Sequence, residues 1–428
     1  MKPQTFIDRL NSGEFDSLLK KLYGESQLEI EKQKKRYTEA VKSFKELYPE
    51  REDIKIYSAP GRTEIGGNHT DHQHGCVLAA AVNLDVIAVV SFHNDGVIRL
   101  KSKGYEKDLI DLSDLSVHNE EMGRSAAIIR GIASYFNDKG VAMGGFDAYT
   151  TSDVLSGSGL SSSAAFETLI GTIIDLHYNG GNAGSVEIAK IGQYAENKYF
   201  GKGSGLMDQM VSSVGGFVYI DFLNTSEPII EKHSFDFEKA GYSICITDTK
   251  GSHSDLTEDY VAVPSEMKKV AAYFGKNVLR EVDEESFYEA VPKLRNTCTD
   301  REIMRAAHFF GENTRAEQEA QALENGDTDR FFELVRQSGE SSANLLQNLY
   351  SCKKPTEQGI PLAIMMSKRI LQDSGAVRVH GGGFAGTIQA FVPVKKIKEY
   401  SDEMNRIFGE GSCYVLRIRP VGGIEITA

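Results

Sequence analysis

The sequence predicts an α+β protein with two domains. The chain has 428 residues, which is enough for two ordinary domains with substantial cores. Its apolar, strand-like segments occur in groups, and helical patterns collect between those groups. Grouped strands favour an α+β arrangement over a doubly wound parallel sheet, in which strands and helices alternate singly.

The composition argues against several classes of protein. Hydrophobic residues make up 40% and charged residues 25%, close to the average of folded domains and far from disordered or fibrous chains. Lys and Arg total 48 against 61 Asp and Glu, which gives a formal net charge of −13. Because this charge repels phosphate backbones and anionic lipids, we expect no nucleic-acid or membrane partner. A local basic pocket for one phosphate ligand is still compatible with it.

The sequence shows no targeting signal. Its start, MKPQTFIDRLNSGEFDSLLKK, lacks the apolar core of a secretory signal. The longest apolar stretch is interrupted by Asn83 and Asp85, which is typical of a buried strand and not of a membrane span. Its five cysteines are scattered and form no CxxC pair, which argues against a disulfide framework or a structural zinc site. We therefore expect a cytoplasmic protein with reduced thiols, of unassigned oligomeric state.

Residues 1–50 are predicted to form a helical arm. Apolar residues recur at helical spacing among charges, at Ile30, Tyr37, Val41, Phe44 and Leu47. The Lys and Arg residues between them suggest an anionic partner, but interleaved Glu residues favour a solvated helix face. We expect a solvated arm.

The first predicted domain covers residues 51–235. IKIYSAPGR alternates like a strand and is predicted to stop at its Pro-Gly turn, and CVLAAAVNLDVIAVVSFHNDGVIRLKSK predicts strands joined by a hairpin at Asn94-Asp95-Gly96. A helix ending at Gly140, a strand at GFDAYTTSDV, the loop LSGSGLSSS and two helices follow. The strand GGFVYIDF ends this domain.

The second predicted domain covers residues 236–428. It opens with the strand YSICITDT and is mainly helical to about residue 374. It closes with the strand-like VRVHGGGFAGTIQAFVP, a helix near 395–408 and the strands CYVLRIRP and GIEIT. Within it, GGGFAG at 381–386 satisfies GxGxxG, but a strand pattern follows where a dinucleotide site needs a helix. A tight hairpin, or a backbone brought close to a ligand, remains.

A second glycine-rich segment, GSGLSSS at 157–163, runs directly into a helix. Glycines let the backbone wrap an anion, and the N–H groups and dipole of a helix start favour phosphate. The serines add hydroxyl donors and Mg²⁺ ligands. The segment lacks the GxxxxGK[ST] pattern of a P-loop, and a flexible capped loop is the alternative.

The segment GRTEIGGNHTDHQHG at 61–75 is the densest in polar side chains. Its histidines suggest a metal site, but their spacing differs from HExxH and no other His/Cys cluster supports one. Polar groups between glycines indicate instead a site for a polar small molecule, with Arg62 available for a phosphate. In GSGLMDQM at 203–210, Asp208 follows a glycine turn, and a helix cap is its alternative role.

These four segments, in this order, resemble the motifs of the GHMP sugar kinases, most closely those of the galactokinases. The first resembles the signature Gly-Arg-Val-Asn-Leu-Ile-Gly-Glu-His-Thr-Asp, and the second resembles the phosphate loop Gly-Leu-Ser-Ser-Ser-Ala. GGGFAG resembles the third GHMP motif, and GLMDQ is similar to Gly-Ile-Met-Asp-Gln. Further similar segments lie at 195–201, 252–260 and 305–315. The resemblance covers roughly residues 54–428.

The resemblance implies a kinase that uses ATP and Mg²⁺ to phosphorylate the anomeric hydroxyl of galactose, the first step of galactose catabolism. It implies an N-terminal domain like ribosomal protein S5 domain 2 and a ferredoxin-like C-terminal domain, with ATP and sugar in the cleft between them. Asp208 would orient the hydroxyl or accept its proton, and Arg62 would neutralise charge in the transition state and keep Asp208 ionised.

The remaining implied roles follow position by position. The sugar-contacting positions are Asn68, His69, Asp71, Gly205 and Tyr260. The ATP-binding positions are Ser102, Gly157, Ser158, Gly159, Leu160, Ser161, Ser162 and Ser163. The Mg²⁺ ligands would be Ser163 and Glu196.

The chain departs from the galactokinase pattern at the sugar signature. Asn68 stands where the family has Glu, and Glu64 stands where it has Asn. The phosphate loop has Leu155 in place of the usual Pro. These changes bear on the substrate more than on the reaction, so a kinase for a galactose derivative or another monosaccharide is one alternative. A sugar-sensing regulator without turnover is another, against which the Ser163-Ala164 step argues.

Overall fold

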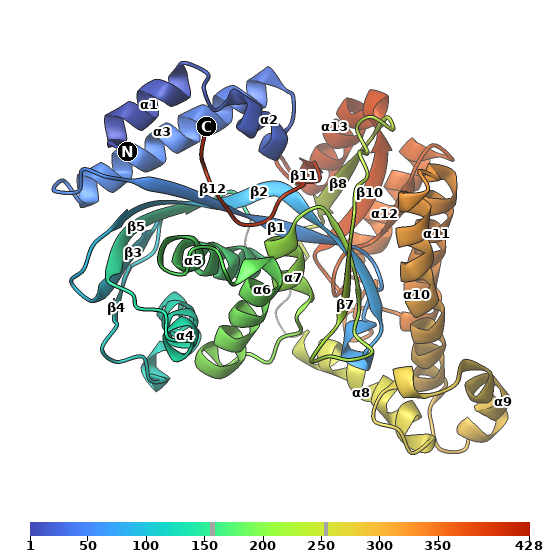
Figure 1. Ribbon diagram of the computed structural model, residues 1–428. Helices are drawn as coiled ribbons and strands as arrows, with labels where there is room; N and C mark the ends of the chain where they lie inside the picture. Colours follow the sequence, from blue (N-terminus) through green and yellow to red (C-terminus); the bar gives the residue numbers. More distant parts are fainter. Residues whose placement is uncertain (155–158, 252–255) are drawn as a thin grey trace.

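The computed structural model describes residues 1–154, 159–251 and 256–428. The molecule contains two β-sheets with helices packed around them, which confirms the predicted α+β class (Figure 1). Within the described ranges, no helix is both long and apolar enough to cross a membrane.

The N-terminal arm consists of three helices that lie across one face of the larger sheet (Figure 1). They are α1 (Pro3–Asn11), α2 (Asp16–Tyr23) and α3 (Gln27–Leu47). Phe15, Tyr37 and Phe44 are buried and share a core with Ile87 and Val89 of the sheet. The helical prediction is confirmed, but the predicted solvated arm is wrong, because an amphipathic helix buries its apolar stripe wherever a sheet face is available.

Eight strands of the described chain form the larger sheet, in the order β12-β1-β2-β5-β3-β4 with β6 and β7 continuing from β2. Their bounds are β1 (Lys55–Gly66), β2 (Cys76–Phe92), β3 (Val97–Ser102), β4 (Lys107–Asp111), β5 (Gly145–Ser152), β6 (Phe217–Asp221), β7 (Ile229–His233) and β12 (Ile424–Glu425). The strand β2 pairs with β5 near its end and with β6 near its start.

Two sequence predictions in this sheet are wrong. The strand β1 does not stop at Pro60-Gly61 but continues to Gly66 through a register shift between Pro60 and Arg62. A bulge is where a sheet tolerates a proline, which lacks the N–H of the ladder. The turn at Asn94-Asp95-Gly96 does not close a hairpin, because β5 lies between β2 and β3 and pairs with β3 in parallel.

Helices on the other face of the larger sheet carry the phosphate loop and Asp208 (Figure 1). They are α4 (Ser125–Asp138), α5 (Ser162–Tyr178), α6 (Gly184–Ala195) and α7 (Met207–Val214), and a π-helical turn at Glu196–Phe200 continues α6. Ala88 and Val90 pack in the core with α4 and α5, whereas their neighbours Ile87 and Val89 face the arm. Because successive side chains of a strand point to opposite faces, β2 contributes alternate residues to the core under the arm and to the core under α4 and α5.

Four strands of the described chain form the smaller, antiparallel sheet, in the order β11-β8-β10-β9. They are β8 (Tyr242–Asp248), β9 (Ala376–Val379), β10 (Thr387–Pro393) and β11 (Cys413–Leu416). The helices around it are α8 (Thr257–Tyr273), α9 (Glu284–Leu294), α10 (Asp300–Glu324), α11 (Thr328–Ser341), α12 (Gly359–Leu371) and α13 (Ile397–Phe408). The glycine segment 381–386 joins the paired strands β9 and β10, which confirms the predicted hairpin.

The chain passes from the larger to the smaller sheet between His233 and Tyr242. Its end then returns: β12 pairs with β1, and Ile426 packs in the core under the arm. The division into an arm at 1–50 and domains at 51–235 and 236–428 stays a prediction.

Candidate active site

Arg62 and Asp208 form a bidentate ion pair between β1 and the first turn of α7. Arg62 Nε donates to Asp208 Oδ1 at 2.6 Å, and Nη2 donates to Oδ2 at 2.7 Å. The carboxylate makes no cap to the backbone of α7. The alternative role of Asp208 as a helix cap is therefore not what the structure shows.

The surroundings of Asp208 keep it ionised. Burial by itself would raise the pKa of this carboxyl group, but the adjacent Arg62 charge and the hydrogen bonds from Arg62 and Ser161 hold its pKa below the ordinary value of 3.8. Ser161 Oγ donates to Asp208 Oδ2 at 2.7 Å. The group is a carboxylate at neutral pH.

The described part of the phosphate loop lies against this pair. Arg62 Nη1 donates to the carbonyl of Gly159 at 2.5 Å, and the Arg62 backbone N–H donates to the carbonyl of Leu160 at 3.0 Å. Ser161 adopts a left-handed φ of 55°, which turns the chain into α5. Of the predicted ATP-binding residues, Gly157 and Ser158 lie outside the described residues.

A cavity of about 600 Å³ lies beside the start of α5. Ser102, Ser162 and Ser163 line it, so three predicted ATP-binding residues meet there. Ser102 Oγ accepts a hydrogen bond from Thr150 Oγ1 at 2.8 Å. Leu160 is buried, and Ser161 bonds to Asp208, so these two residues are placed toward the Arg62–Asp208 pair. Hydroxyl groups beside a helix N-terminus suit a phosphate chain.

Two buried carboxylates share one amide next to this cavity. Gln209 Nε2 donates to Glu196 Oε2 at 2.9 Å and to Glu167 Oε2 at 3.0 Å, and Lys202 pairs with Glu196 Oε1 at 3.0 Å. Glu167 Oε1 is buried and has no hydrogen-bond partner in the described chain. Burial, followed by the charge of Glu196, raises the pKa of Glu167 to about 8.

This donor set fits a divalent cation. An orphaned carboxylate oxygen, a second carboxylate and the Ser163 hydroxyl are the hard oxygen ligands that Mg²⁺ prefers. Glu167 is not among the residues that the sequence motifs predict for the site. Its signal was the four-residue spacing from Ser163, which puts both side chains on one face of α5.

The predicted sugar-contacting residues gather at the glycine hairpin between β9 and β10. Asn68 Nδ2 donates to the carbonyl of Gly381 at 2.8 Å, and Tyr260 Oη donates to that of Gly383 at 2.9 Å. His69 Nε2 lies 3.0 Å from the carbonyl of Gly382, an acceptor, so this nitrogen carries the proton. Burial lowers the pKa of His69 to about 4, so its ring is neutral at pH 7.

Asp71 and Gly205 complete this group. A side chain on Gly205 would place its Cβ 3.2 Å from Asp71 Oδ2, so the glycine keeps the approach to this carboxylate open. Across the described ranges, no three His, Cys, Asp or Glu side chains are grouped to hold a metal ion. The alternative of a metal site among the histidines of residues 69–74 is therefore not supported.

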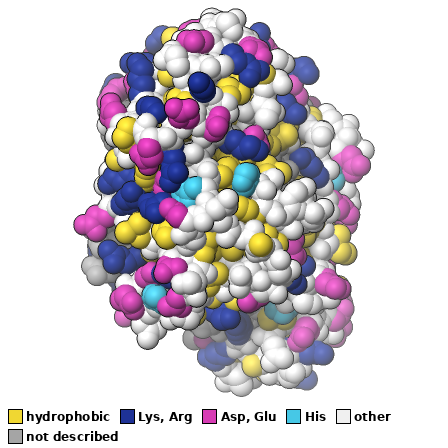
Figure 2. All heavy atoms as spheres, turned by 60° about the vertical axis from the view of Figure 1, so that its left-hand side comes forward, with side chains coloured by type: hydrophobic (Ala, Val, Ile, Leu, Met, Phe, Trp, Pro, Cys, Tyr) yellow, Lys and Arg dark blue, Asp and Glu magenta, His cyan; other side chains and the backbone are white. Residues whose placement is uncertain are grey.

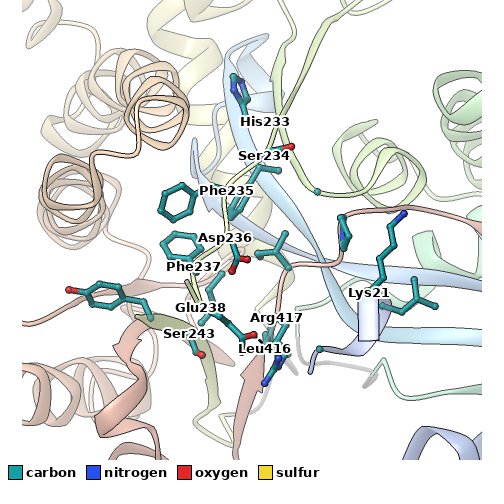
Figure 3. A pocket seen from close by; sticks show the side chains of 18 of the residues that line it. Lys21, His233, Ser234, Phe235, Asp236, Phe237, Glu238, Ser243, Leu416 and Arg417 are labelled. Carbon is teal, nitrogen blue, oxygen red and sulfur yellow. Dashed lines mark hydrogen bonds and ion pairs between the residues drawn. The ribbon is translucent and has the colours of Figure 1, made fainter. Parts of the chain in front are cut away.

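A second cavity, of about 430 Å³, contains none of the predicted site residues. It lies between α2, the link from β7 to β8, and β11. In Figure 3, Lys21 lies on one side of it, and the rings of Phe235 and Phe237 point to the other side. On the face of the molecule in Figure 2, basic and acidic side chains are interspersed.

Two family models match the chain. The galactokinase galactose-binding signature matches residues 42–92, and the GHMP kinases N terminal domain matches residues 127–216. The first range contains Arg62 and the sugar-side residues 68–71, and the second contains α5 and Asp208.

Several solved structures of similar fold are described as kinases. Lactococcus lactis galactokinase complexed with galactose is 22% identical with a TM-score of 0.75, over 90% of this chain and 98% of the other. Methanococcus jannaschii mevalonate kinase is 18% identical with a TM-score of 0.60, over 86% and 98%. A D-glycero-D-manno-heptose 1-phosphate kinase from Bacteriodes thetaiotaomicron is 17% identical with a TM-score of 0.58, over 88% and 99%. At these identities, the likeness shows the fold.

Proposed function

Because the chain belongs to the GHMP kinases and carries the galactokinase sugar-binding signature, we propose that it transfers the γ-phosphoryl group of ATP to the anomeric hydroxyl of galactose. The products are galactose 1-phosphate and ADP. The observation that carries this proposal is the bidentate Arg62–Asp208 pair held against the phosphate loop.

The chain's own residues supply positioning and charge. The anomeric oxygen attacks the γ-phosphorus, the bond from that phosphorus to the β–γ bridging oxygen breaks, and ADP leaves. Asp208 orients the hydroxyl and receives its proton as the new P–O bond forms. Its low pKa makes it a weak base, which suits a loose transition state that needs little proton removal before bond formation.

Arg62 links the two substrates. Its guanidinium bonds to Asp208 on one side and to Gly159 of the phosphate loop on the other. This position places a fixed positive charge where negative charge develops during transfer. With 11% of the Arg62 side chain exposed, its hydrogen bonds to Asp208 and Gly159 hold the guanidinium in place.

The phosphate side would hold ATP and Mg²⁺. The start of α5, with Ser162 and Ser163, faces the triphosphate, and Ser163, Glu196 and Glu167 would hold the ion. Bound there, Mg²⁺ supplies neutralisation of phosphate charge. His69, Asp71, Gly205 and Tyr260 would position the sugar opposite.

The deciding experiment is coupled ADP release with Mg·ATP on a panel of sugars. The panel contains galactose, 2-deoxygalactose, N-acetylgalactosamine, galacturonate, glucose and arabinose. We expect turnover selective for galactose and a loss of at least about a thousandfold in kcat for Asp208→Asn. Asp138→Asn at the exposed end of α4 is the matched control and should keep full activity.

Other outcomes have definite meanings. Turnover on a different sugar alone would keep the reaction and replace the substrate, which is the second candidate function. Asn68 favours that candidate, because its amide is 1% exposed and bonded within the protein. Galactose binding without turnover would make the protein a sugar-sensing regulator, and an Asp208→Asn variant with full activity would exclude the assigned role of Asp208.

A further inference from the structure

The strand β1 presents a row of side chains toward the candidate site. Arg62 and Glu64 flank Thr63 in a regularly paired part of the strand, so the two share one face of it. Arg62 holds Asp208 at one end of this row. Glu64 is the next residue on the same face, and its carboxyl group feels the charges of both Arg62 and Asp71.

The amide of Asn68 is already used inside the protein. Its Nδ2 donates to Glu64 Oε1 and to the carbonyl of Gly381, both at 2.8 Å, so both amide hydrogens are engaged. Its Oδ1 accepts from Asn348 Nδ2 at 3.0 Å. With 1% of the residue exposed, Asn68 has neither a donor nor accessible surface left for a sugar.

Glu64 is different in both respects. Its Oε1 accepts from Asn68 and from Arg378 Nη2 at 2.9 Å, but no described residue donates to its Oε2. Its side chain keeps 9% of its surface exposed, whereas the Arg378 side chain is fully buried. An acceptor oxygen that keeps accessible surface and has no donor within the described chain can receive a hydrogen bond from a ligand.

We propose that Glu64, and not Asn68, is the residue that reads a hydroxyl group of the sugar. In this assignment Glu64 Oε2 accepts a hydrogen bond from the substrate, and Asn68 and Arg378 are positioning residues that hold Oε1. The preferred substrate is then a neutral monosaccharide, because a uronate would bring a second carboxylate against Glu64. The inference rests on the proposed function of the same site.

The residue types at positions 64 and 68 allow a reciprocal exchange that tests this assignment. Its sugar signature exchanges the two residue types of the galactokinase pattern, with Glu at 64 and Asn at 68. Because the two side chains contact each other, the reciprocal double variant Glu64→Asn/Asn68→Glu keeps one carboxylate and one amide in the same small volume. It serves as the rescue for each single change.

The experiment measures kcat and KM separately for sugar and ATP in Glu64→Gln, Asn68→Ala and the double variant. We expect Glu64→Gln to raise the sugar KM by about 10- to 100-fold, with the KM for ATP unchanged within about twofold. Asn68→Ala should raise the sugar KM less, and the double variant should recover most of the loss. Glu285→Gln in the exposed first turn of α9 is the matched control.

Deoxy sugars identify the hydroxyl that Glu64 reads. Removing that hydroxyl should weaken sugar binding by the wild type but should not weaken sugar binding by Glu64→Gln any further. Removing any other hydroxyl should weaken sugar binding by the same factor in both proteins. Where a variant turns over slowly, calorimetric measurement of sugar binding provides the same comparison of two sugars in two proteins. Circular dichroism checks that each variant is folded.

The outcomes separate this inference from the proposed function. No turnover of any sugar by the wild type contradicts the proposed function. Normal wild-type turnover with an unchanged sugar KM in Glu64→Gln contradicts the inference, as does a larger effect of Asn68→Ala than of Glu64→Gln. Faster use of galacturonate than of galactose by the wild type also overturns it.

Discussion

Asp85 on β2 and Glu64 on β1 are both buried carboxylates paired with arginine, yet their surroundings differ. Asp85 is fully buried, and both of its oxygens accept hydrogen bonds. Arg36 donates to Oδ1 at 2.6 Å, while Tyr23 at 2.6 Å, Arg419 at 2.8 Å and Ser58 donate to Oδ2. These donors come from the arm, β1 and the returning C-terminal segment.

The Glu64 cluster contains acceptors without donors. The hydrogen bonds to the Glu64 carboxylate from described residues both reach Oε1 and leave Oε2 without a donor. Nearby Glu319 on α10 is fully buried with neither carboxylate oxygen bonded. Burial, with the charges of Glu312 and Glu64, raises the pKa of Glu319 well above its ordinary value. A buried carboxylate whose oxygens all accept hydrogen bonds holds segments of the chain together. Carboxylate oxygens without a hydrogen-bond donor instead indicate a place where a ligand binds.

Asp85→Ala should give the largest effect on stability. It leaves the Arg36 and Arg419 guanidinium groups buried without their shared carboxylate, and breaking such a group costs about 3–5 kcal/mol. Urea unfolding followed by circular dichroism measures the change, and the exposed Asp329→Ala on α11 should lie within about 0.5 kcal/mol of the wild type. A loss below about 1 kcal/mol would show that the cluster does not fasten the arm.

Tyr23→Phe removes one donor and keeps the ion pairs. The Tyr23 hydroxyl bonds to Asp85 Oδ2 and lies 2.8 Å from Tyr37 Oη, so its loss should cost about 2 kcal/mol. The same unfolding assay should rank it between Asp85→Ala and the surface control. Sugar and ATP KM values should not change, because the arm contributes no residue to the site. A changed KM would tie the arm to the active site instead.

The sequence predicted the elements better than their partners. Hydrophobic periodicity located the arm helix α3, because the spacing of apolar residues shows which face of a helix is apolar. The strand pattern after the glycine segment 381–386 indicated β10. Neither pattern predicted that β5 inserts between β2 and β3, or that the arm covers a sheet face, because pairing depends on contacts distant in sequence. Both outcomes are set by tertiary packing.

In the candidate site, too, the sequence predicted some residues but not their contacts. Motif order pointed to Arg62 and Asp208, which the fold brings together across 146 positions of sequence. The bonding of Asn68 was not predictable, because its partners Asn348 and Gly381 come from the second half of the chain. A motif gives the residue type at a position, but the hydrogen bonds of a buried amide are known only when the surrounding segments are packed.

Glu319→Gln should have the smallest effect at neutral pH and the opposite pH dependence to the Asp85 variants. The folded-state pKa of Glu319 is raised, so its contribution to stability is full below its ordinary value of 4.5 and is lost as pH rises above that value. The pKa of Asp85 is held low by Arg36 and Arg419 despite its burial, so its contribution is lost as pH falls. A neutral amide at 319 needs no proton, so Glu319→Gln should match the wild type near pH 5 and become more stable by about 1 kcal/mol toward pH 8. Urea midpoints across this pH range measure the difference. Destabilisation at every pH would show that Glu319 has a donor and belongs with Asp85 as a fastening group.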